Sequence, residues 1–211
     1  MPSEKIVVIG CAVLGADMRA AAERLRLSVS FNFLEAGLHE RPERLRQKLQ
    51  AAIDDVSATG APGRIVIGYG VCGRGTIGIQ SRGTALVMPR VHDCIALFLG
   101  GAEAYRREFG NCPGTYYVSA GWYREKAVPV AQQHRQAWYG DKQVHWADIA
   151  HRYGDRAAAQ TMRFLNAWHK NYQRAAFIET GTRDASRSEA HAREMALAHK
   201  WRFEKIQGSP A

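Results

Sequence analysis

The sequence predicts an α/β fold in which a mainly parallel sheet carries helices on both faces. Short continuous runs of β-branched residues, such as Ile6–Ile9 and Arg64–Gly68, are typical of strands buried on both sides. These runs alternate along the chain with segments rich in Ala, Leu and charged residues, the order expected of strand–helix–strand units. With 211 residues, 46% hydrophobic and 23% charged, the chain has the composition of a folded protein. We therefore expect one Rossmann-like, three-layer α/β domain over residues 1–211.

The first half of the chain shows four strands and three helices. The second helix is the clearest, because Leu45, Leu49 and Ile53 form one apolar stripe and Pro42 suits the first turn. The third helix is expected to break at Gly100–Gly101. The predicted strands are 5–10, 29–34, 64–68 and 84–88, and the predicted helices are 17–27, 41–56 and 94–109.

The second half is more helical. Its predicted elements are a strand at 114–119, a helix over 147–172 that is interrupted near Gly154, a strand at 175–179, a helix at 188–199 and an edge strand at 201–206. Residues 132–142 read as a loop or excursion, and a helical excursion is expected at about 125–172.

The formal net charge of +9, from 29 basic and 20 acidic residues, suits an anionic partner. Because the charge is spread out rather than clustered, it favours a small anionic ligand over nucleic acid. No apolar run approaches the ~20 residues of a membrane span, and Met1–Lys5 lacks the pattern of a secretory signal. We expect a cytoplasmic protein without a membrane partner. The sequence leaves open whether the protein forms a homo-oligomer.

Chemistry-bearing residues gather at the carboxyl ends of the predicted strands, the edge at which open parallel sheets bind ligands. Cys11, Cys72 and Cys94 follow three separate strands, and His92 lies beside the last. Three such thiolates can bind a soft metal ion or an iron–sulfur cluster and leave one position open for a substrate. The alternative is that they are small buried side chains or redox-active thiols, since free cysteine is often buried. Cys112 is expected to have no role.

The glycine-rich segment GYGVCGRGTIG, residues 68–78, follows a predicted strand. Its backbone N–H groups can form an anion-binding concavity, which makes Gly70, Gly73, Arg74 and Gly75 candidate cofactor-binding residues. Arg90 is a further candidate from the next loop. The alternative is a tight turn that needs positive φ angles.

The step Arg90–Cys94 ends a strand and opens a helix. His92 and Asp93 are candidate catalytic residues, with Asp93 orienting His92 for proton transfer. The alternative role of Asp93 is the helix N-cap. A position near a helix N-terminus is expected to lower the pKa of Cys94, which suits either a metal ligand or a nucleophile.

The segments GYGVCGRGTIG, MPRVHDCIALFLG and PGTYYVSAGW, with IVVIGCAVLGADM at the start and FLEAGLHERPERLRQKLQAAID between, resemble one family of prokaryotic proteins. That family is catalogued as domain of unknown function 1638 (DUF1638), and the resemblance covers most of residues 4–206. It implies an association with corrinoid-dependent methyltransferase systems, and hence with one-carbon or cofactor metabolism.

Three functions are open on these grounds. The first is a metal centre, most simply an iron–sulfur cluster and alternatively zinc or another transition metal, held by Cys11, Cys72 and Cys94 and acting on a small anionic substrate. The second is a carrier that delivers a metal or corrinoid to a methyltransferase protein. The third is a metal-free transferase that uses Cys72 or Cys94 as its nucleophile.

Overall fold

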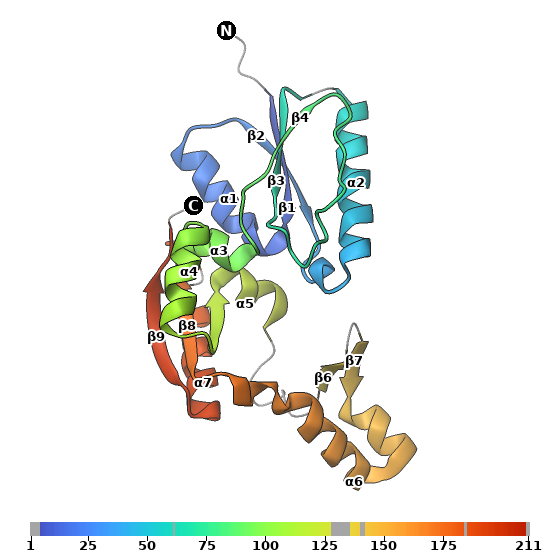
Figure 1. Cartoon of the computed structure of the whole chain (residues 1–211), viewed down its shortest axis with the longest axis vertical. Coiled ribbons are helices and arrows are strands. Elements are labelled where there is room, and N and C mark those ends of the chain that lie inside the picture. The colour runs from blue at the N-terminus through green and yellow to red at the C-terminus, as the bar shows by residue number, and fades with distance from the viewer. Residues whose placement is uncertain (1–4, 61, 128–135, 140–141, 184, 210–211) are drawn as a thin grey trace.

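The computed structural model describes residues 5–60, 62–127, 136–139, 142–183 and 185–209. Its first sheet contains four parallel strands in the order β2-β1-β3-β4, namely β1 (Ile6–Cys11), β2 (Val29–Leu34), β3 (Arg64–Gly68) and β4 (Ala85–Val87). The helices α1 (Gly15–Arg24) and α2 (Pro42–Ala58) lie on opposite sides of this sheet (Figure 1). The connection from β1 to β2 through α1 and the connection from β2 to β3 through α2 run in opposite directions across the sheet, so each face of the sheet receives one helix.

A second parallel sheet has the order β5-β8-β9, with β5 (Thr115–Ser119), β8 (Arg174–Glu179) and β9 (Arg202–Gln207). Its helices include α4 (Ala102–Asn111), α5 (Ala120–Lys126) and α7 (Ala185–His199). The buried Arg174 guanidinium ties these elements together, because it donates to Thr115 at 2.9 Å, Glu204 at 2.8 Å and Glu108 at 3.0 Å. Each nitrogen of the Arg174 guanidinium thus has a hydrogen-bond acceptor, as the burial of a charged group requires.

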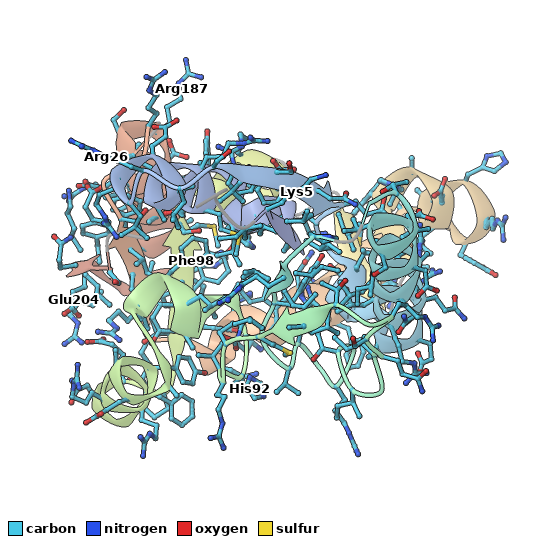
Figure 2. All side chains as sticks on the ribbon, turned by 90° about the horizontal axis from the view of Figure 1, so that it is seen from above. Lys5, Arg26, His92, Phe98, Arg187 and Glu204 are labelled. Atoms are coloured by element: carbon cyan, nitrogen blue, oxygen red, sulfur yellow. The ribbon has the colours of Figure 1, made fainter. Side chains whose placement is uncertain are left out.

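The carboxyl ends of the two sheets face each other at the middle of the molecule (Figure 1). The 3₁₀ turn η1 (Ala12–Leu14) follows β1 and touches the start of α5, where a Cβ on Gly121 would come within 1.8 Å of the Val13 carbonyl oxygen. The chain after β9 reaches the helix α3 (Cys94–Leu99), since the Ser209 amide donates to the Phe98 carbonyl at 2.9 Å. Phe98 is buried inside the molecule (Figure 2). One apolar core includes residues of both sheets, among them Ile9, Ile67 and Ile178.

A projecting arm contains the antiparallel hairpin of β6 (Gln136–Tyr139) and β7 (Lys142–His145), followed by the helix α6 (Trp146–Leu165) (Figure 1). The arm returns to β8 through the 3₁₀ segment η4 (Asn166–Asn171). The helix α6 is kinked at Gly154, whose φ of 82° and ψ of 163° are not helical. Only glycine adopts this φ without a steric penalty, so the residue type explains the position of the kink.

The predicted α/β class, with parallel strands and covering helices, is confirmed. The strands are divided between two parallel sheets and a hairpin. The breaks at Gly100–Gly101 and Gly154 are confirmed, and β9 is an edge strand as predicted. The helix α5 and the hairpin were not predicted. The strand β6 falls in the 132–142 segment, of which residues 132–135 and 140–141 lie outside the described part, and β7 continues past it to His145. Among the described residues, no helix is long and apolar enough to cross a membrane.

Candidate functional site

Three cysteines lie at the carboxyl edge of the first sheet. Cys11 is the last residue of β1, Cys72 follows β3, and Cys94 is the first residue of α3 after β4. The strand order reverses between the neighbours β1 and β3. The chain leaves β1 toward β2 on one side of the sheet, and it leaves β3 toward β4 on the other side. Such a reversal opens a crevice between the diverging connections, and ligands of open α/β sheets bind there.

The loop after β3 lies directly against the segment that precedes α3. The Val71 amide donates to the Val91 carbonyl at 3.0 Å, and the Cys72 amide donates to the His92 carbonyl at 2.8 Å. A Cβ on Gly70 would lie 2.8 Å from the Asp93 amide nitrogen, so only glycine permits this approach. The two segments therefore hold Cys72 and Cys94 at the same edge.

The three thiols lie within electrostatic reach of one another. Burial, with smaller contributions from the charges of Cys11 and Asp93, raises the pKa of Cys72 to about 11. Burial raises the pKa of Cys94 to about 12, with additional contributions from Asp93, Cys11 and Cys72. Burial also raises the pKa of Cys11. The expected lowering of the Cys94 pKa at the helix N-terminus is wrong, because desolvation and neighbouring negative charges outweigh the favourable end of a six-residue helix.

Tyr69 completes the site and was not identified from the sequence. It is 3% exposed, and its hydroxyl lies within hydrogen-bonding reach of the Cys11 thiol. Burial raises the pKa of Tyr69, and the neighbouring Cys11 and Cys72 raise it further. The signal was its position one residue beyond a buried strand, at the same edge as the cysteines. The Tyr69 hydroxyl therefore belongs to the same buried cluster as the Cys11 thiol.

The backbone at Cys72 is strained. Cys72, Gly73 and Arg74 have φ angles of 45°, 64° and 73°, three consecutive residues in the left-handed region. For residues other than glycine this region costs about 1–2 kcal/mol each. Strain of this kind persists where the surrounding structure enforces it, and it clusters at functional sites.

The glycines of this loop are explained by packing. Gly70 contacts the His92 and Asp93 backbone, and a Cβ on Gly75 would lie 2.6 Å from the Leu45 side chain of α2. Gly73 adopts a positive φ. The tight-turn interpretation accounts for Gly73, whereas close packing accounts for Gly70 and Gly75. The role of these glycines in binding an anion stays a prediction.

His92 and Asp93 form a pair at the rim. The His92 imidazole is 74% exposed, and its Nδ1 lies 3.2 Å from an Asp93 carboxylate oxygen (Figure 2). The other Asp93 oxygen accepts from the Ile95 and Ala96 amides at 3.0 and 3.2 Å. Asp93 thus serves as the N-cap of α3 and as a partner of His92 at once. The Arg74 and Arg90 side chains are exposed on the two loops that carry the cysteines.

Residues of the second half also reach the site. The charge of Glu125 raises the pKa of Cys11 and that of Lys126 lowers it. These effects show that the end of α5 lies close to the Cys11 thiol. The Lys126 ammonium in turn lies 3.0 Å from Glu40. In the described part of the chain, no three His, Cys, Asp or Glu side chains lie close enough as they stand to hold one metal ion.

Comparisons with known proteins give one match. No curated protein and no solved structure matches the chain. The model of a family described as "Protein of unknown function (DUF1638)" matches residues 33–211, which include Cys72, His92 and Cys94 but not Cys11. Because the match covers most of the chain, the protein belongs to the DUF1638 family.

Proposed function

We propose that this protein is a metal–thiolate protein in which Cys11, Cys72 and Cys94 together bind an iron–sulfur cluster. Zinc or another transition metal is the alternative occupant. The bound centre acts on, or is delivered with, a small anionic substrate or cofactor. A cytoplasmic location, where thiols stay reduced, is part of this proposal.

One observation supports the proposal: three thiols from three strand ends lie close enough that Cys11 raises the pKa of Cys72, and both raise the pKa of Cys94. Thiols with a pKa of about 11 or 12 are protonated at pH 7, and no cation in the described chain is close enough to all three to stabilise them as thiolates. A soft metal cation supplies the positive charge that stabilises the thiolates, and it displaces the thiol protons.

The donor set favours a cluster over a single ion. A zinc ion requires every sulfur about 2.3 Å from one point. In a 4Fe–4S cluster each cysteine binds a different iron atom, which suits thiols that come from three separate strand ends. Three cysteines leave one iron open to an exogenous ligand.

The surroundings of the thiols suit a negatively charged substrate. Arg74 and Arg90 are exposed on the two loops that carry Cys72 and Cys94 and attract its anionic groups. His92, held by Asp93, donates or accepts a proton at its exposed ring. The earlier resemblance adds one-carbon or corrinoid-linked metabolism, and a methyltransferase partner, as the setting of this chemistry.

The test is the iron and acid-labile sulfide content of protein purified without oxygen. We expect near-stoichiometric iron and sulfide in the wild type, and loss of both in each of Cys11→Ser, Cys72→Ser and Cys94→Ser. Cys112→Ser is the matched control: this cysteine is also buried but follows α4, and the variant should keep its iron.

Other outcomes separate the alternatives. One zinc ion without sulfide, lost in the same three variants, would replace the cluster by a mononuclear centre. Iron retained in all three variants would place the metal elsewhere. The absence of any metal, both as purified and after reconstitution with iron and sulfide, would overturn the proposal and leave thiol chemistry.

A further inference from the structure

A cavity lies far along the chain from the three cysteines, beside the arm. It has a volume of about 520 Å³, and α6, η4 and the end of α7 line it. The volume lies within the range of small-molecule sites, about 300–1,000 Å³. Its walls include Trp146, Met162, Arg163, Trp168, His169 and His199.

Aromatic rings form one end of this cavity. The His169 and His199 imidazoles are stacked, with ring centroids 4.8 Å apart, and His199 stacks in turn on Trp201 at 4.6 Å. Trp168 packs on the same group, 6.0 Å from His199. The group is fixed to the second sheet, because Trp168 also stacks on Tyr116 of β5 at 5.7 Å. Flat, rigid faces of this kind favour a flat aromatic ligand.

One wall atom lacks a partner. The Nε2 atom of His199 is buried and makes no hydrogen bond within the described residues. Burial lowers the pKa of His199, and the neighbouring His169 lowers it further, so the ring is neutral at pH 7. A buried polar atom without a partner costs free energy, and a ligand that hydrogen-bonds to it recovers that cost. The partner of His169 Nδ1 is already present, the Asn166 carbonyl.

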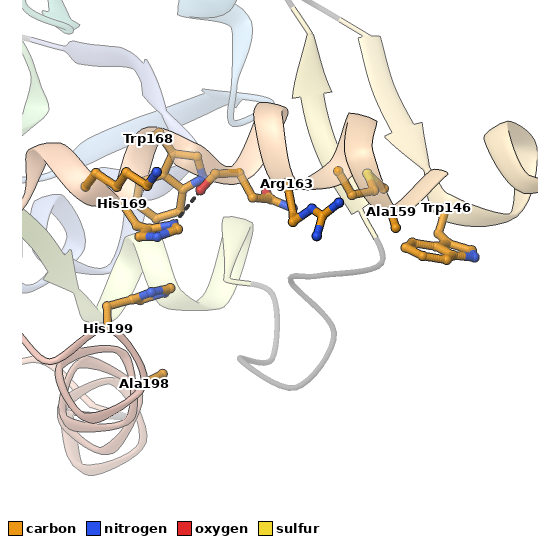
Figure 3. Close-up of a pocket in the computed structure, with 10 residues that line it drawn as sticks. Trp146, Ala159, Arg163, Trp168, His169, Ala198 and His199 are labelled. Atoms are coloured by element: carbon orange, nitrogen blue, oxygen red, sulfur yellow. Dashed lines mark hydrogen bonds between the residues drawn. The ribbon is translucent and has the colours of Figure 1, made fainter. Parts of the chain in front are cut away.

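The opposite end and the middle of the cavity add a tryptophan and a cation. The kink at Gly154 turns α6 so that Trp146, at its start, lines the same cavity as Ala159 and Met162. Figure 3 shows Arg163 between Trp146 at one end and the two histidines at the other. Lys170 is a second cation on the wall.

From this combination we infer a second ligand site, independent of the thiol site, that binds a planar aromatic acid. The aromatic part lies against Trp168 and His169, and its anionic group faces Arg163. The hydrogen-bonding edge of the ligand meets His199.

The probe for the test is 8-anilinonaphthalene-1-sulfonate, an aromatic sulfonate whose fluorescence rises in an apolar site. N-phenyl-1-naphthylamine is the uncharged counterpart. We expect Ala159→Trp, which fills the cavity, to weaken both probes at least tenfold. Arg163→Gln should weaken the sulfonate about fivefold or more and leave the uncharged probe unchanged.

Leu197→Ser is the matched control, because Leu197 is 83% exposed on α7 beside the cavity residues Ala198 and His199. Its affinity should stay within twofold of the wild type. Unchanged affinity in Ala159→Trp, or loss in Leu197→Ser alone, would overturn the inference.

A measurement on the unmodified protein covers the case in which Ala159→Trp fails to fold. Titration with the sulfonate, followed by the imidazole proton resonances, should shift those of His169 and His199 with the same Kd as the fluorescence. Shifts confined to other histidines would contradict the site.

Discussion

At the residue scale, Cys72 shows the difference between what the sequence and the structure convey. Its place after a buried strand was enough to predict that it lies at the ligand-binding edge with Cys11 and Cys94. The direction of its pKa shift could not be predicted, because burial and the neighbouring Asp93 and Cys11 depend on tertiary packing. Tyr69 was missed for a related reason: a tyrosine after a strand has no distinct pattern, and its significance comes from its burial against the Cys11 thiol.

The raised pKa of Cys72 predicts slow alkylation in the metal-free protein. A pKa of about 11 against the ordinary 9.0 lowers the thiolate fraction at pH 8 about 100-fold. Iodoacetamide should therefore modify Cys72 about 100-fold more slowly in the folded than in the urea-unfolded protein, by peptide mass spectrometry. The rate should rise tenfold per pH unit between pH 8 and 10. Rapid modification at pH 7 would favour the nucleophile function instead.

The same shift affects stability in a definite direction. A thiol whose pKa is higher in the folded state binds its proton more tightly there, so its contribution is complete below pH 9 and is lost as the pH rises toward 11. Cys72→Ser should reduce this alkaline loss of stability relative to the wild type.

At the element scale, periodicity identified the regular helices and the buried strands, with ends displaced by a few residues. The helix stripe of Leu45, Leu49 and Ile53 is fully buried, as its spacing predicts. The short helix α5 was missed because its sequence, AGWYREK, has no apolar repeat; its Ser119 N-cap, which accepts from the Trp122 amide at 3.1 Å, was the available signal.

The start of α5 provides a prediction about how the elements fit. A Cβ on Gly121 would lie 1.8 Å from the Val13 carbonyl, a backbone atom that cannot turn aside. Gly121→Ala should lower the free energy of unfolding by about 1–3 kcal/mol in urea titrations. Gly110→Ala, in a helix with no heavy atom near the new methyl group, should raise it by about 0.5–1 kcal/mol. Equal effects of the two substitutions would show that η1 and α5 do not pack closely.

At the scale of the whole molecule, the alternation of strands and helices predicted the α/β class but not the division into two sheets. Local pattern records which segments are buried strands, whereas pairing of β5 with β8 rather than with β4 depends on contacts distant in sequence. The consequence for function is that the end of α5 lies near the thiol site, because the charges of Glu125 and Lys126 act on the pKa of Cys11. Both halves of the molecule therefore contribute to the proposed centre.

The most direct test of the central claim is a crystal structure of iron-loaded protein, prepared without oxygen, with diffraction recorded at the iron absorption edge. The account predicts anomalous density bonded to the sulfurs of Cys11, Cys72 and Cys94, at iron–sulfur distances of about 2.3 Å, close to those of other metal–thiolate bonds. Ordered iron bound elsewhere, with these three thiols unligated, would contradict it.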